Sequence, residues 1–189
     1  QAYIFLASAG ARFFDEDGKV IFNNPRTVKA LTMYHELFTY NPPGAEAWSW
    51  GEIELNIAAG TIGMSPYFPS VQKRFHEEFD SRDYAASHIP MFKGSTRRGT
   101  ITYPNEVHIY KQTLENSAKL EAVGEFVRFM MRPEINAILT SGQEPGGFFP
   151  TTDAAANAPE YWDNPIVKRF ENIHRVAMEA LQDYASLYG

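Results

Sequence analysis

The chain has 189 residues, with 17 basic and 23 acidic side chains and no cysteine. This composition excludes disulfides, thiolate metal sites and cysteine catalysis, while 44% apolar residues are enough to build a sizeable core. A net charge of −6 without a clustered basic surface argues against a nucleic-acid partner, and the longest apolar run, Tyr3–Ala9, is too short to span a membrane.

The first third of the chain carries clear signals for local structure. Tyr3–Ala9 predicts one short helix. Residues 13–22 predict a hairpin, because Asp17-Gly18 is a favoured two-residue turn between apolar runs. Asn24 can cap a helix that starts at Pro25, and apolar residues recur at helical spacing from there to Phe38.

The next elements are predicted from a capping box and from proline positions. Ser49 and Glu52 form the capping box of a helix over residues 50–59, which ends at Gly60. We expect a short strand at Thr61–Ser65, a charged helix at residues 71–79 and a further strand at Tyr84–Ile89.

The second half of the chain predicts one strand and three long helical segments. Residues 90–99 are the best candidate for a crossing between domains. Glu106–Tyr110 alternates apolar and polar residues, so it predicts a strand with Val107 and Ile109 facing a core. Helices are expected at residues 117–131 and 133–140, and one long helix begins at Pro165.

Catalytic and metal-binding patterns are weak in this sequence. The five histidines include no pair at the spacing that places two imidazoles on one metal, and we expect each of them at the surface or satisfied in a core. Neither a Gly-x-Ser-x-Gly nucleophile turn nor a glycine-rich phosphate loop is present. The sequence therefore predicts no catalytic residue, no metal ligand and no cofactor.

Aromatic residues gather instead in loops and at the ends of elements, beside glycine or proline. Such rings offer flat apolar faces that can stack on sugars or on other small amphipathic ligands. The alternative is that they pack locally against the core. The residues concerned are Trp48, Trp50, Tyr67, Phe68, Tyr103, Phe148 and Phe149.

The order of these signals resembles the family 1 extracellular solute-binding proteins of ABC importers, which include maltose-binding-protein-like members. The hairpin and Asn24-Pro25, then Trp50-Gly51-Glu52 and residues 59–64, are similar to signatures of that family. Further similar segments are Pro90–Gly94, residues 116–134 with Pro133-Glu134, and Gly146–Thr152.

The resemblance implies an α/β, helix-rich chain that corresponds to the C-terminal part of a two-lobed, periplasmic-binding-protein-like type II fold. Residues 1–91 then begin the C-terminal lobe, residues 92–142 return to the N-terminal lobe, and residues 143–189 complete the C-terminal lobe. Family members are about twice as long, so an N-terminal lobe, or another copy of the chain, is an expected partner.

The resemblance also implies a non-enzymatic mechanism in the periplasm or elsewhere outside the cytoplasm. Two lobes close by hinge bending on a sugar or similar small solute, which ABC permease subunits then receive. The implied ligand-binding residues are Trp50, Tyr67, Phe68, Tyr103, Asn105, Phe148 and Phe149, with Arg97, Glu106 and Thr152 as further polar candidates. The family's usual residues before the interior strand are replaced by Tyr103-Pro104-Asn105, so the ligand's identity does not transfer.

Two alternatives come from other functional classes. A small glycoside hydrolase would use a carboxylate pair such as Glu52 and Glu106. An interaction module would expose apolar surface, most of all in the returning segment, and would pair with another chain.

Overall fold

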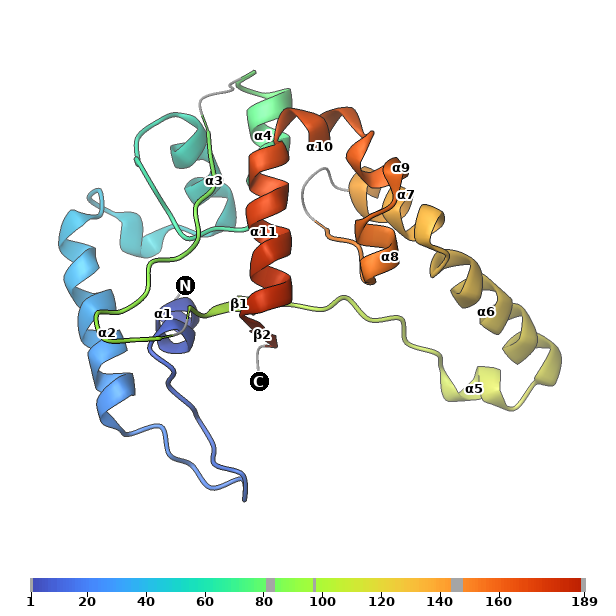
Figure 1. Ribbon diagram of the computed structural model, residues 1–189, viewed down its shortest axis with the longest axis horizontal. Helices are drawn as coiled ribbons and strands as arrows, with labels where there is room; N and C mark the ends of the chain where they lie inside the picture. Colours follow the sequence, from blue (N-terminus) through green and yellow to red (C-terminus); the bar gives the residue numbers. More distant parts are fainter. Residues whose placement is uncertain (1, 81–83, 97, 144–147, 188–189) are drawn as a thin grey trace.

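The computed structural model describes residues 2–80, 84–96, 98–143 and 148–187. Helices dominate this part of the chain (Figure 1), which confirms the helix-rich expectation. Two short strands, β1 (Thr100–Thr102) and β2 (Ala185–Leu187), form a parallel pair in which Thr100 lies opposite Ala185. These two strands join the middle of the described chain to its C-terminal region.

The N-terminal segment folds as two packed helices. The helix α1 (Ala2–Ser8) contacts α2 (Pro25–Leu37), which continues into the 3-10 turn η1 (Phe38–Tyr40). Asn24 caps α2 as predicted, because its side-chain oxygen accepts hydrogen bonds from two backbone amides of the first turn, at 3.0 and 3.1 Å. The predicted hairpin forms in a short version: Phe14 and Val20 make an antiparallel bridge, the Asp15 amide donates to the Lys19 carbonyl oxygen at 3.0 Å, and the Ile21 amide donates to the Phe13 carbonyl oxygen at 2.8 Å.

Two short helices follow and bring the aromatic loop into place. After the 3-10 turn η2 (Ala45–Ala47), α3 (Trp50–Ala58) begins at the predicted capping box, in which Glu52 accepts the Ser49 amide hydrogen bond at 2.9 Å. The chain leaves α3 through Gly60 at a φ of 70° and later forms α4 (Val71–Glu77). An ion pair of 2.8 Å between Glu54 and Arg74 joins α3 to α4.

Three predicted strands are wrong. Thr61–Ser65, Tyr84–Ile89 and Glu106–Tyr110 are irregular or extended chain without strand pairing. Val107 is 64% exposed and Ile109 is 43% exposed, so neither of them faces a core. Alternation predicts which side chains share a face, but a strand also needs a neighbouring strand to complete its hydrogen bonds.

The chain then extends as an arm. After β1 it runs through α5 (Lys111–Leu114) and α6 (Ser117–Met130) before α7 (Pro133–Gln143) returns to the body of the molecule. Figure 1 shows α5 and the first turns of α6 standing away from the other helices. The predicted apolar stripe on α6 is therefore incompletely covered, and no residue of α6 is buried.

The C-terminal segment consists of short helices and one longer helix. The elements are α8 (Asp153–Ala156), α9 (Pro159–Trp162), α10 (Pro165–Arg169) and α11 (Glu171–Asp183). The single long helix predicted from Pro165 is interrupted at Phe170, where the backbone leaves helical geometry at a φ of −113° and a ψ of 33°. The Phe170 ring is buried and lies 6.3 Å from the Phe75 ring, so tertiary packing accompanies the break.

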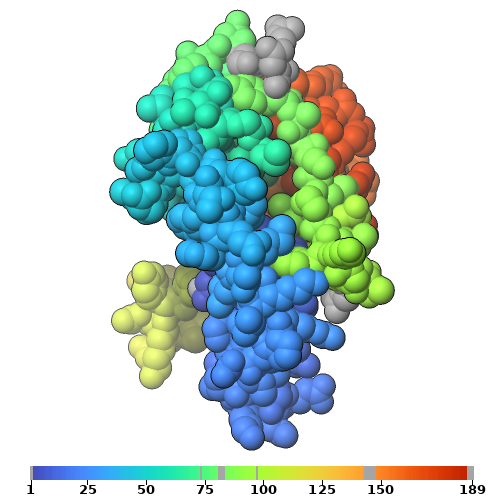
Figure 2. Space-filling view, turned by 90° about the vertical axis from the view of Figure 1, so that its left-hand side faces the viewer, coloured from blue at the N-terminus to red at the C-terminus, as the bar shows by residue number. Residues whose placement is uncertain are grey.

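Among the residues that the structure describes, buried apolar side chains form three separate cores. The α1–α2 core contains Phe5, Leu6, Ala30 and Phe92; the α3–α4–α11 core contains Ala58, Val71, Phe75, Phe170 and Ile173; and the α7–α10 core contains Ala137, Ala158, Tyr161 and Val167. In Figure 2 the α2 face is turned toward the viewer and the arm is visible to one side of it. The fold is thus a set of small packed groups rather than one large interior.

Candidate functional site

Four predicted ligand-binding aromatics lie together and form what we call the aromatic cluster: Trp50, Tyr67, Phe68 and Tyr103. The Trp50 and Phe68 rings are stacked, with centroids 4.9 Å apart and an angle of 16° between planes. The ring centroid of Phe68 lies 5.7 Å from that of Tyr103 and 6.0 Å from that of Tyr67. Because Trp50 is 61% exposed and Tyr103 is 50% exposed, the cluster presents ring surface to solvent.

Local sequence features bring these rings from three parts of the chain. Trp50 is the first residue of α3, so the capping box fixes its backbone. Tyr67 and Phe68 lie between Pro66 and Pro69, which restrict the loop before α4. Tyr103 directly follows β1, and the pairing of β1 with β2 fixes the position of the backbone just before Tyr103.

Hydrogen bonds to the Trp50 carbonyl oxygen and to Glu54 hold the Tyr67 hydroxyl in place. The Tyr67 hydroxyl lies 3.0 Å from the Trp50 carbonyl oxygen and 3.1 Å from Glu54 Oε1, while Arg74 Nε donates to Glu54 Oε2 at 2.8 Å. Burial and the Glu54 charge raise the pKa of Tyr67, so its phenol stays neutral and acts as a hydrogen-bond donor. The hydrogen bond to Glu54 raises the pKa of Arg74.

Glu54 and Arg74 were missed by the sequence reasoning. They are 20 residues apart on different helices, and nothing in the spacing of a single sequence predicts that α3 and α4 pack side by side. The one available signal was helical position: Glu54 lies one turn after Trp50 on the same helix, as an i, i+4 neighbour.

The other predicted ligand-binding residues are not joined to the cluster. Phe149 is half-buried and packs against the α7–α10 core, with its ring centroid 5.9 Å from that of His174. Phe148 is half-buried, and among the described residues no ring contact links it to the cluster. Asn105 is exposed two residues beyond Tyr103.

The additional polar candidates have structural partners or fall outside the described chain. Thr152 caps α8, accepting a hydrogen bond from the Ala155 amide at 3.2 Å. Glu106 pairs with His108 at 3.3 Å on an exposed stretch. Arg97 lies outside the described residues.

Glu52, one half of the hypothetical hydrolase pair, serves as a helix cap. It accepts hydrogen bonds from the Ser49 hydroxyl and amide, and the bond from the hydroxyl is the main cause that lowers the pKa of Glu52. A glycosidase general acid needs the opposite shift, so that it holds a proton near neutral pH. Glu52 therefore lacks the environment of a general acid.

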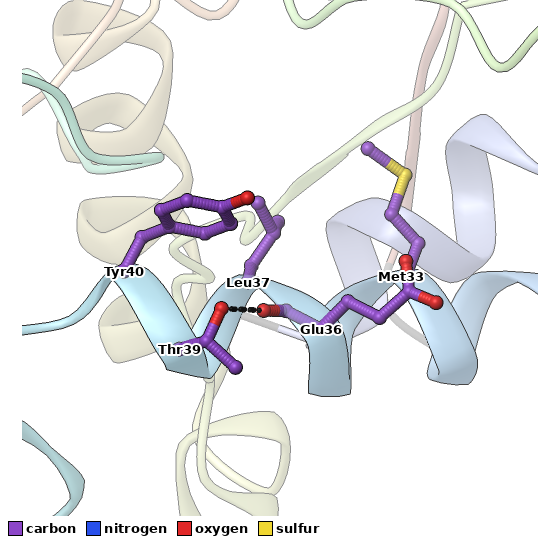
Figure 3. Close-up of a pocket in the computed structure, with 5 residues that line it drawn as sticks. All are labelled: Met33, Glu36, Leu37, Thr39 and Tyr40. Carbon is purple, nitrogen blue, oxygen red and sulfur yellow. Dashed lines mark hydrogen bonds between the residues drawn. The ribbon is translucent and has the colours of Figure 1, made fainter.

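A surface hollow of about 340 Å³ lies elsewhere, at the C-terminal end of α2. Figure 3 shows its five lining residues, Met33, Glu36, Leu37, Thr39 and Tyr40, on consecutive turns of one segment. The Thr39 hydroxyl is already engaged, donating to the Glu36 carbonyl oxygen at 2.8 Å. Because its walls come from a single segment, the hollow lacks the converging polar groups of a typical solute site.

The described residues contain no group of three or more His, Cys, Asp or Glu side chains that could hold a metal ion. Within the same described ranges, none of the helices is both long enough and apolar enough to cross a membrane. The exposed ring faces and the tyrosine hydroxyls of the aromatic cluster can offer ring stacking and hydrogen bonds.

Comparison with known proteins identifies the family. The family model described as bacterial extracellular solute-binding protein matches residues 1–137. The putative ABC transporter periplasmic-binding protein YcjN of Escherichia coli (strain K12) is 24% identical over 164 residues, which are 87% of this chain and 36% of the relative. The chain thus spans about a third of the length of this curated relative. Since the family model covers well over half of the chain, the chain belongs to the bacterial extracellular solute-binding proteins.

Proposed function

We propose that the aromatic cluster forms part of the binding wall of an ABC importer's solute-binding protein, which holds a sugar or similar small solute without altering it. The observation that carries this proposal is the stacked Trp50–Phe68 pair, which has the half-exposed Tyr103 ring beside it. Apolar faces of pyranose-like rings stack on such surfaces, and the polar edges of the tyrosines serve the hydroxyl groups. ABC permease subunits would receive the solute outside the cytoplasm.

In the same proposal, the solute is held between two lobes that close by hinge bending. Residues 1–91 and 143–189 belong to the lobe that carries most of the cluster, and residues 92–142 pass into the other lobe. The incomplete cover of α6 supports this division, since Phe126 is 57% exposed and Phe129 is 44% exposed. The covering partner is the N-terminal lobe, or a second copy of the chain where that lobe is lacking.

Ring removal tests the proposed binding wall. In the complete native protein that contains this chain, Trp50→Ala or Tyr103→Ala should weaken binding of the recognised solute by about 1.4 kcal/mol, roughly tenfold in Kd. Isothermal titration calorimetry against a panel of mono- and oligosaccharides, amino acids and polyamines finds the solute and measures the loss.

Tyr40→Ala is the matched control, because Tyr40 is 84% exposed and lies outside the cluster. Its Kd should equal that of the unmodified protein. Unchanged binding in both cluster variants would remove the aromatic cluster from the site, and a panel in which no solute binds would contradict the proposed function itself.

A further inference from the structure

A buried histidine lies at the meeting point of three helices. His174 of α11 is fully buried, and both of its ring nitrogens have partners. Its Nδ1 lies 2.7 Å from the Tyr161 hydroxyl of α9, and its Nε2 lies 2.9 Å from Gln72 Oε1 of α4. Tyr161 and Gln72 are also fully buried, so this chain of three side chains, the His174 link, runs through the interior.

The His174 link joins two of the three cores. Tyr161 belongs to the α7–α10 core, whereas Gln72 follows Val71 of the α3–α4–α11 core on the same helix. His174 itself follows Ile173, another member of the α3–α4–α11 core. The α7–α10 core and the α3–α4–α11 core share no buried residue, and the His174 link connects them by hydrogen bonds.

The partners of His174 define where its proton lies. Burial raises the pKa of Tyr161, so its phenol stays protonated and can donate to Nδ1 when that nitrogen carries no hydrogen. The amide oxygen of Gln72 can only accept, so Nε2 carries the hydrogen in the neutral ring. Both bonds are thus satisfied by neutral His174.

No charged partner for an imidazolium faces this site among the described residues. The rings nearest to His174 are those of Tyr161, at 5.5 Å, and Phe149, at 5.9 Å. The charged and titratable side chains that the structure describes on α4, α9 and α11 are paired or exposed. The pairs are Arg74 with Glu54 and Glu78, His76 with Arg169, Arg175 with Glu171, and Glu179 with His88, while Glu77, Glu160 and Asp183 lie at the surface. A proton added to His174 would create an uncompensated buried charge.

We propose that the His174 link is an acid-sensitive latch, which couples the α7–α10 core to the α3–α4–α11 core near neutral pH and releases this coupling when His174 is protonated. The unfolded chain binds this proton near the usual histidine pKa of 6.5, whereas burial lowers the pKa of His174 in the folded chain to about 4. Between these values the unfolded state holds more protons, so stability falls as the pH drops from about 6.5 toward 4.

Urea denaturation of the 189-residue chain at pH 7 and pH 5 tests the stability part of the proposal. Lowering the pH from 7 to 5 should raise the unfolding equilibrium constant roughly 20-fold through the titration of His174 alone. Most carboxylates are still ionised at pH 5, so they add little to this change. His174→Phe should lack this increase, whereas His108→Asn, at an exposed histidine, should keep it. An equal pH response in the His174→Phe variant and the unmodified chain would overturn the latch.

A direct titration covers the case in which His174→Phe does not fold. In the unmodified chain labelled with ¹³C-histidine, the His174 ring signal should shift with a midpoint near 4. A midpoint near 6.5 would overturn the latch, because the folded chain would then accept the proton without cost.

To detect loss of coupling between the two cores, one measurement must report on the unfolding of a single core. Trp162 of α9 packs against the α7–α10 core, so its fluorescence in a Trp48→Phe, Trp50→Phe background reports that core alone. Its urea transition should coincide with the far-ultraviolet circular dichroism transition at pH 7 and occur at lower urea at pH 5. Coincident transitions at both pH values would overturn the proposed uncoupling.

Discussion

Gly99 occupies a position where no side chain fits. A Cβ there would overlap the backbone of Ala7 and come within 2.6 Å of the Ser8 nitrogen, and the Ser8 hydroxyl donates to the Gly99 carbonyl oxygen at 2.7 Å. Because the atoms that would have to move belong to the α1 backbone, they cannot yield by rotating a side chain. The segment just before β1 is thereby held against α1.

Substituting this glycine should be costly. We expect Gly99→Ala to lower the free energy of unfolding by about 1–3 kcal/mol, because it forces β1 away from α1. Urea denaturation followed by circular dichroism measures the change. Gly63→Ala is the control, since a Cβ at Gly63 meets nothing within 4 Å. Equal midpoints for the two variants would show that the contact contributes little.

At the scale of elements, α6 is distinctive because it carries large apolar side chains without burying any of them. In an isolated soluble helix such exposure favours association with another surface. Phe126 is 57% exposed on α6, whereas Phe75 of α4 is only 2% exposed in the α3–α4–α11 core. Substituting each of these two phenylalanines therefore compares the effect of removing an exposed ring with the effect of removing a buried ring.

We expect Phe126→Ala to change the free energy of unfolding by less than about 0.5 kcal/mol, and Phe75→Ala to lower it by about 3–5 kcal/mol. Chemical denaturation of both variants measures this difference. Sedimentation velocity should also show less self-association for Phe126→Ala. A large loss of stability at Phe126 would mean that α6 is packed in the isolated chain.

The helix ends were predictable from the sequence, and the strands were not, for a physical reason. Asn24 and the Ser49–Glu52 box act within one helical turn, so their residues contain all the information that the cap needs. The pairing of β1 with β2 joins residues 85 positions apart, and no local pattern in Thr100–Thr102 indicates that partner. Phe170, where the expected long helix is interrupted, likewise packs against residues distant in the sequence, which no local pattern indicates.

The candidate site was predictable in part for the same reason. Loop position identified Trp50, Tyr67, Phe68 and Tyr103 individually, and the fold then brings the other three rings within about 6 Å of the Phe68 ring. Phe149 satisfies the same loop criterion but packs against His174, because the choice between ligand site and interior depends on packing that one sequence does not display.

For the whole molecule, three small cores joined by a few links imply uneven resistance to unfolding. The arm of residues 103–131 belongs to none of these cores, whereas Tyr161 lies at the centre of the α7–α10 core. Tyr110 on the arm is 77% exposed, and Tyr161 is fully buried. A protease should therefore reach the arm before it reaches the α7–α10 core.

Limited digestion with chymotrypsin tests this expectation. Cleavage after Tyr110 should precede cleavage after Tyr161, and mass spectrometry of the fragments identifies the order. In the complete native protein the arm should be protected, because the proposed second lobe covers it. Rapid cleavage at Tyr110 in both forms would contradict the assignment of residues 92–142 to a covered segment.

The parallel pairing of β1 and β2 has a practical consequence for building a biosensor from this chain. A fluorophore or surface tether coupled to residues 185–187 would load the strand that holds Thr100–Thr102 and, beyond it, Tyr103 of the aromatic cluster. Mechanical strain on β2 would therefore be passed through β1 to the aromatic cluster. Tyr40, exposed at the end of η1, is an attachment point whose loading leaves this pairing undisturbed.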